Sequence, residues 1–185
     1  MRYLIGMNRF LASLAVLLSI AIPLTAQEAP TMKPVVSMAP ATVVTVTQGK
    51  VGQVPLLFRV TRGYHINSNK PKSEFLIPTA LKIGATTDIV IGGVTYPEGR
   101  DMSFAFAPDE KLSVYTGDFE LDVNVRPLRS VQAGKYVVRG SLKYQACDNA
   151  ACYPPQQLPI SFDVRIGKAA PPARKNPAQS PHSHK

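Results

Sequence analysis

The sequence predicts an all-β protein, most simply an immunoglobulin-like antiparallel β-sandwich. Several segments alternate apolar and polar residues with a period of two, and no segment shows the 3.6-residue period of an amphipathic helix. Turn-forming Gly, Pro and Asn separate these segments, as is typical of sandwiches. A jelly roll or an open barrel is the alternative architecture. The chain contains no Trp, so the buried Trp of antibody domains is absent.

The first 26 residues have the pattern of a secretory signal peptide. Arg2 and Arg9 are followed by an apolar run over 10–24 and by Leu-Thr-Ala before Gln27. The run is shorter than the roughly 20 residues of a spanning helix, which favours cleavage after Ala26 over an uncleaved anchor. We therefore expect a signal peptide over 1–26 and a linker over 27–41.

The other end is predicted to be a disordered tail. Residues 168–185 are rich in Pro, Ala and Ser and lack apolar alternation, so they cannot bury enough apolar surface to offset the entropy lost on ordering. Of the 21 Lys and Arg residues, two lie in the signal peptide and four in this tail, which leaves 15 against 12 acidic residues. The remaining basic residues are scattered, so nucleic-acid binding is not supported. The single folded domain is predicted over 42–167.

Within that domain, three segments give the clearest strand pattern: 119–126, 158–166 and 134–147, the last interrupted at Gly140. Each places apolar residues on one face and polar residues on the other, which is typical of a half-buried antiparallel strand. Weaker candidates are 42–47, 54–61, 79–83 and 88–96.

One segment lacks the strand pattern. We interpret 97–110 as a long excursion that carries Phe104 and Phe106. Long loops in compact domains are usually functional or disordered. The two phenylalanines argue against disorder, because such side chains are expected to pack over another part of the protein. An additional edge strand is the alternative.

The two cysteines of the chain, Cys147 and Cys152, lie in one predicted hairpin connection. Outside the cytosol such a pair is usually oxidised at least part of the time. In the loop-entropy account, a disulfide that closes a ring of about six residues stabilises a fold by only about 2 kcal/mol, whereas one that closes a 100-residue loop contributes about 4.7 kcal/mol. An exposed turn with two thiols also suits thiol–disulfide exchange, which needs an accessible sulfur and a second thiol to resolve the mixed disulfide. The spacing alone leaves both roles open.

Four stretches carry a family resemblance. "YQACDNAACYPP" at 144–155 resembles the redox hairpin of the N-terminal periplasmic domain of the DsbD family of thiol:disulfide interchange proteins, in which two cysteines precede Tyr-Pro-Pro. "GYHINSNKP" from Gly63, "FLIPTALKI" from Phe75, and "YPEG" with "LSVYTG" from Tyr96 are similar to the same family. The resemblance extends in order over most of 43–166.

The resemblance implies an immunoglobulin-like sandwich whose redox hairpin lies under a cap loop that moves aside for a thioredoxin-like partner. It implies that Cys152 forms the mixed disulfide and that Cys147 resolves it. The cap should be the 97–110 segment, with Phe104 or Phe106 over the disulfide, although the acidic-acidic-Phe cap sequence of the family is not reproduced. His65 would assist proton transfer or would simply be a packed histidine. The expected surroundings of the cysteines are Tyr64, His65, Asn67, Asp101, Phe104, Phe106, Tyr144, Tyr153 and Pro154.

The resemblance further implies a monomeric periplasmic exchange module without a cofactor, and without membrane insertion once the signal peptide is cleaved. Nothing like the membrane or thioredoxin domains of DsbD follows in the sequence, so electrons are expected to arrive in trans, from a membrane reductase or a thioredoxin-like protein. Clients would be a disulfide isomerase or a thioredoxin of cytochrome c maturation. Two alternatives stay open: a secreted β-sandwich binding domain with an inert disulfide, and a Cu(I) handler using Cys147, Cys152, His65 and Met102.

Overall fold

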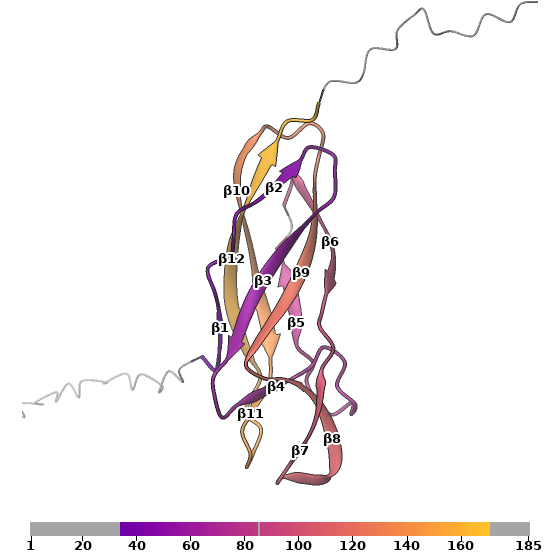
Figure 1. Ribbon diagram of the computed structural model, residues 1–185, viewed down its shortest axis with the longest axis vertical. Coiled ribbons are helices and arrows are strands. Elements are labelled where there is room, and N and C mark those ends of the chain that lie inside the picture. Colours follow the sequence, from indigo (N-terminus) through magenta and orange to yellow (C-terminus); the bar gives the residue numbers. More distant parts are fainter. Residues whose placement is uncertain (1–33, 85, 171–185) are drawn as a thin grey trace, which may run out of the picture. The chain divides into compact units, whose positions relative to one another are not determined.

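The computed structural model describes residues 34–84 and 86–170, and these residues form twelve strands and no helix (Figure 1). The predicted signal peptide over 1–26 and residues 171–185 of the predicted tail lie outside the described residues. The strands make three four-stranded sheets, two of which form the sandwich.

The first sheet has the strand order β1-β3-β9-β6, and all its pairs are antiparallel. Its longest strand, β9, covers the predicted segment 119–126 and buries every second side chain, which confirms the period-2 prediction. The four strands are β1 (Val36–Met38), β3 (Gly52–Val60), β9 (Asp118–Pro127) and β6 (Ile89–Thr95).

The second sheet has the order β2-β12-β10-β5 and is antiparallel except for the β2–β12 pair, which is parallel. Strand β10 runs through Gly140 without a break, contrary to the predicted interruption. A Cβ at Gly140 would lie 2.4 Å from the Lys82 carbonyl oxygen, so glycine lets β5 approach closely. The strands are β2 (Val44–Thr47), β12 (Gln156–Gly167), β10 (Gly134–Tyr144) and β5 (Ala80–Ile83).

These two sheets contribute to one hydrophobic core. Phe58 of β3 stacks on Phe119 of β9 with ring centroids 5.4 Å apart, and the inward side chains of β10 and β12 belong to the same cluster. Burial of these alternating apolar residues is the main stabilising contribution to such a sandwich.

The third sheet lies at one end of the sandwich and carries the cysteines (Figure 1). Its order is β11-β4-β8-β7, and its pairs are antiparallel. The predicted excursion over 97–110 is therefore largely a β-hairpin of β7 and β8 rather than an irregular loop. The strands are β11 (Ala146–Cys147), β4 (His65–Asn67), β8 (Ala107–Tyr115) and β7 (Arg100–Phe104).

Strand structure begins before the predicted start of the domain at residue 42. Strand β1 lies inside the predicted linker 27–41 and pairs with β3 through Val36↔Val60. Val36 is fully buried in the core, which explains why this short segment joins the sheet.

Candidate functional site: the cysteine hairpin and its cap

Cys147 and Cys152 form a disulfide at the tip of a tight hairpin. Cys147 ends β11, and the two residues face each other in an isolated antiparallel bridge with Cα atoms 3.9 Å apart. The amide of Tyr153 donates to the Ala146 carbonyl at 2.8 Å, which continues the pairing beyond the cysteines. Cys147 is fully buried, whereas Cys152 is half-buried. The two sulfurs therefore differ in how closely a second protein can approach them.

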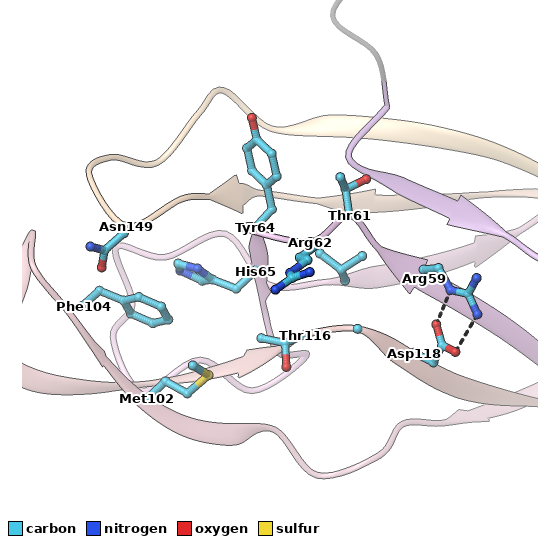
Figure 2. A pocket seen from close by; sticks show the side chains of 13 residues that line it. Arg59, Thr61, Arg62, Tyr64, His65, Met102, Phe104, Thr116, Asp118 and Asn149 are labelled. Atoms are coloured by element: carbon cyan, nitrogen blue, oxygen red, sulfur yellow. Dashed lines mark hydrogen bonds and ion pairs between the residues drawn. The ribbon is translucent and has the colours of Figure 1, made fainter.

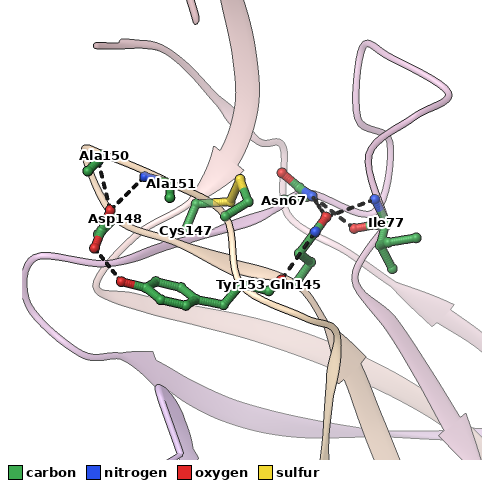
Figure 3. The surroundings of a disulfide bond; sticks show 9 residues. Asn67, Ile77, Gln145, Cys147, Asp148, Ala150, Ala151 and Tyr153 are labelled. Atoms are coloured by element: carbon green, nitrogen blue, oxygen red, sulfur yellow. Dashed lines mark hydrogen bonds between the residues drawn. A yellow bond between two sulfur atoms is a disulfide. The ribbon is translucent and has the colours of Figure 1, made fainter. Parts of the chain in front are cut away.

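The side chain of Asp148 organises the turn between the cysteines (Figure 3). Its Oδ1 accepts hydrogen bonds from the amides of Ala150 and Ala151 at 2.7 and 2.9 Å, which is typical of an aspartate that forms a turn. The Tyr153 hydroxyl donates to Oδ2 at 2.5 Å. This hydrogen bond, followed by those from the two amides, lowers the pKa of Asp148, and it raises the pKa of Tyr153.

A second polar network fixes the base of the hairpin (Figure 3). Gln145 donates from Nε2 to the Tyr153 carbonyl at 3.2 Å, and its Oε1 accepts from Asn67 Nδ2 at 3.2 Å. The Ile77 amide donates to the same Oε1 at 3.3 Å, so the chain near Ile77 is held against the hairpin. The only sign of Gln145 in the sequence is that a polar residue stands between the inward-facing Tyr144 and Ala146.

His65 of β4 lies directly across from Cys147 of β11 in the strand register. The side chain is only 3% exposed, and its Nε2 has no hydrogen-bond partner. Burial lowers the pKa of His65 to about 4, although the nearby Asp148 carboxylate acts in the opposite direction. The imidazole is therefore neutral at neutral pH.

The tip of the β7–β8 hairpin covers His65 (Figure 2). The Phe104 ring stacks on the imidazole with centroids 3.7 Å apart and planes within 11°. Phe106 is parallel to both rings, with its centroid 5.6 Å from Phe104 and 6.2 Å from His65. The Ala105 amide also donates to Asn149 Oδ1 at 3.5 Å, a long hydrogen bond between the cap and the cysteine turn. We call residues 100–107 the cap.

An ion pair holds the base of the cap. Lys72 Nζ lies 2.5 Å from Asp101 Oδ2 and links the chain after β4 to β7. Both side chains are about half exposed, so this pair contributes at most about 1 kcal/mol.

The other predicted residues surround the hairpin in different ways. Tyr64 packs against Tyr153 with centroids 6.1 Å apart, and Pro154 is exposed after Tyr153. Tyr144 is buried in the core, its hydroxyl donating to Gln156 Oε1 at 2.7 Å, and burial raises its pKa. The structure thus brings the predicted residues together around the hairpin and its cap, with Tyr144 on the core side.

A largely apolar pocket of about 510 Å³ opens beside the cap (Figure 2). His65, Phe104 and Asn149 line it on the side of the cysteine hairpin. At its opposite side, Arg59 and Asp118 form a bidentate ion pair with distances of 2.5 and 2.8 Å. The pocket places a concave apolar surface next to the cysteine hairpin.

Within the described ranges 34–84 and 86–170, no three His, Cys, Asp or Glu side chains cluster in a way that could hold a metal ion. In that same part of the chain, no helix has the length and apolar character needed to cross a membrane.

Comparison with solved structures finds several matches of low sequence identity, among them two N-terminal domains. The N-terminal domain of DsbD from Neisseria meningitidis, in the reduced form, is 18% identical, with a TM-score of 0.41; the match covers 60% of this chain and 77% of that one. The N-terminal periplasmic domain of ScsB from Proteus mirabilis is 14% identical, with a TM-score of 0.44, and the match covers 69% of this chain and 44% of that one. No curated protein matches the chain significantly.

Residues 33–163 match the protein family described as "Thiol:disulfide interchange protein DsbD, N-terminal". The match includes both cysteines and the cap, and it ends within β12 of the second sheet. Together with the Cys147–Cys152 disulfide, it supports a thiol–disulfide exchange module. The chain belongs to the family of DsbD N-terminal domains.

Proposed function

We propose that this chain is a periplasmic exchange module that carries reducing equivalents from a donor protein to oxidised client proteins through Cys147 and Cys152. The observation that carries the proposal is the asymmetry of the disulfide, with Cys152 half-buried at a turn and Cys147 fully buried behind it. Exchange needs one sulfur that a partner can reach and a second thiol that resolves the mixed disulfide, and the unequal burial assigns these roles to Cys152 and Cys147.

In the reducing direction, the Cys152 thiolate attacks a sulfur of the client disulfide, and the other client sulfur leaves as a thiolate. Cys147 then attacks the Cys152 sulfur, which releases the second client thiolate and leaves the domain oxidised. Two electrons pass to the client, and each released thiolate takes up one proton. The donor reverses these steps and restores the dithiol.

The cap would control access to this chemistry. Its tip contacts the cysteine turn through Asn149 and covers His65, the strand neighbour of Cys147. Displacement of the cap by a partner would widen access to the disulfide, and small thiols would react more slowly while the cap is closed. We assign the covering role to Phe104 because its ring lies closer to His65 than that of Phe106.

We further propose the donor and client classes that the family resemblance implies. The donor is a membrane-embedded thiol reductase or a thioredoxin-like protein acting in trans, and the clients are thioredoxin-like periplasmic proteins, including a disulfide isomerase or a thioredoxin of cytochrome c maturation. The domain acts as a monomer, and export depends on a signal peptide over 1–26. The apolar pocket beside the cap is consistent with a protein partner, since exposed apolar patches often mark interaction sites.

Equilibration of the purified domain in glutathione and dithiothreitol buffers tests the exchange function. We expect the cysteines to exchange between dithiol and disulfide at potentials above about −300 mV. A pair that stays oxidised below that value is a structural disulfide, and the chain would then be a secreted binding domain instead.

Partner trapping tests the proposed partners. Cys147→Ser should accumulate mixed disulfides through Cys152 with thioredoxin-like proteins of the periplasm. The matched variant Cys152→Ser should trap far less, because Cys147 is buried. Equal trapping by the two variants, or none by either, would contradict the assigned roles.

A further inference from the structure

His65 is a buried polar side chain with an unsatisfied nitrogen. It is 3% exposed, and Nε2 has no hydrogen-bond partner. Leaving a buried polar group unpaired costs about 1–3 kcal/mol, so such groups are rare and are found where the group has another role. A phenylalanine at this position would keep the aromatic stack without that cost.

The unpaired imidazole lies beside a reacting sulfur. His65 and Cys147 are directly opposed on β4 and β11, and opposed residues project to the same face of a sheet with Cβ atoms about 4.5–5.5 Å apart. Figure 2 shows the ring directed towards Phe104 and Asn149, the latter in the cysteine turn. The imidazole is thus within side-chain reach of Cys147.

Resolution of a mixed disulfide needs the thiolate of Cys147. In exchange chemistry the thiolate is the attacking species, and a thiol in buried, apolar surroundings gives up its proton less readily than an exposed one. Cys147 is fully buried, and Phe104 covers the neighbouring ring, so bulk water is a poor proton acceptor at this place. A neutral base beside the sulfur would remove this obstacle.

We infer that His65 accepts the proton of Cys147 as Cys147 attacks the Cys152 sulfur, and so speeds resolution of the mixed disulfide. This inference rests on the proposed exchange function. The Cys147–Cys152 bond forms, the bond between Cys152 and the partner breaks, and the electron pair leaves with the partner sulfur. The proton passes from Cys147 to the imidazole and then to the departing thiolate, so the imidazole ends neutral.

The charges around His65 are compatible with this transfer. Asp148, on the cysteine hairpin, favours the protonated imidazole. Arg62 and Tyr64 precede His65 in the chain, and Arg59 and Asp118 form an ion pair across the pocket. The pKa of about 4 belongs to the disulfide form; a thiolate at Cys147 adds an opposite charge nearby, which raises the pKa of the imidazole when the proton is transferred.

The experiment uses stopped flow to measure how fast the mixed disulfide is resolved, starting from the reduced full chain. Dithiobis(nitrobenzoate) first reacts with Cys152 and releases one thionitrobenzoate, at a rate that depends on reagent concentration. Attack by Cys147 then releases the second at a rate independent of reagent, which isolates resolution. The variants are His65→Phe, which keeps a ring to stack on Phe104, and His65→Gln, which keeps hydrogen-bonding capacity. His182→Phe is the matched control, the same substitution at a position outside the described residues.

We expect both His65 variants to slow the second phase about 10- to 100-fold at pH 7, at or below the lower end of the range for positioned acid–base groups. Their rates should rise steadily with pH and converge with wild type at high pH, where solvent base removes the proton. The first phase and the control should stay within about twofold of wild type.

Three results would overturn the inference while leaving the exchange function intact: an unchanged second phase, a slowing by the same factor at every pH, or a wild-type rate in His65→Gln. The uniform slowing would indicate a packing role, and the rescue by glutamine would indicate hydrogen bonding alone. Failure of the wild-type chain to release a second thionitrobenzoate would instead contradict the proposed exchange function.

Discussion

Replacing Phe104 by alanine should make the disulfide more accessible to small thiols. The Phe104 ring lies 3.7 Å from the imidazole of His65, centroid to centroid, which is shorter than the separations of Phe106 from His65 and from Phe104. Stacked aromatic pairs contribute about 0.5–1.5 kcal/mol beyond the area they bury. If reduction requires the cap to open, losing this contact raises the open fraction, and therefore the rate, about 2- to 12-fold, since about 1.4 kcal/mol corresponds to a factor of ten.

The assay is the pseudo-first-order reduction of the disulfide by dithiothreitol at pH 7, followed by alkylation of quenched samples. Phe106→Ala is the matched variant within the cap and should have a smaller effect, because its ring is 6.2 Å from His65. Phe75→Ala is the control for loss of a phenylalanine elsewhere, since Phe75 is 87% exposed. A Phe104→Ala rate equal to wild type, or an equal acceleration by Phe75→Ala, would refute the reasoning that the Phe104 contact holds the cap closed.

Three further predictions follow from the electrostatics of the site. Lys72→Ala removes the ion pair with Asp101 and should speed reduction of the disulfide by dithiothreitol by less than about fivefold. The difference from wild type should vanish in 1 M salt, where the Debye length is about 3 Å. An effect that persists in high salt would contradict an ionic cause. Because the pKa of His65 is lowered from 6.5 to about 4, the neutral imidazole favours the folded state, so the free energy of unfolding should fall as pH drops from 6.5 to 4. Denaturant unfolding should show that His65→Phe loses this dependence, and a retained slope would assign it to another group. The pKa of Asp148 is also lowered, so its contribution to the stability of the fold is present above its unfolded pKa of 3.8 and is lost as pH falls through the lower folded value. The thermal unfolding temperature of Asp148→Asn should therefore vary less with pH below pH 4 than that of wild type. Identical pH curves for the two proteins would count against the role of the turn carboxylate.

The long strands of the sandwich were predictable because each has one face in the core and one in solvent. Strands β9, β10 and β12 bury alternate side chains, which is the pattern visible in the sequence. The third sheet lacks this pattern for two different reasons. All three residues of β4 are buried, so nothing alternates, and β7 is exposed along most of its length because it forms the edge of the cap hairpin.

Much of the candidate site was also visible in the sequence, but not its internal arrangement. The cysteine pair and its place in one hairpin connection follow from residue types and spacing, and the family resemblance implies the cap over 97–110. The link through Gln145 and the ion pair of Lys72 with Asp101 do not, because each joins segments that are brought together only by the sheet register.

By itself, the sequence determined that the protein is all-β, that its two cysteines share one short hairpin, and that it resembles the DsbD N-terminal domains. These properties are local, since alternation and spacing are written along the chain. Only the tertiary structure decided which sulfur is buried, and that the ring next to it is His65 beneath Phe104. Burial and ring stacking depend on which distant segments pack together, and the lowered pKa of His65 follows from that packing rather than from its neighbours in sequence.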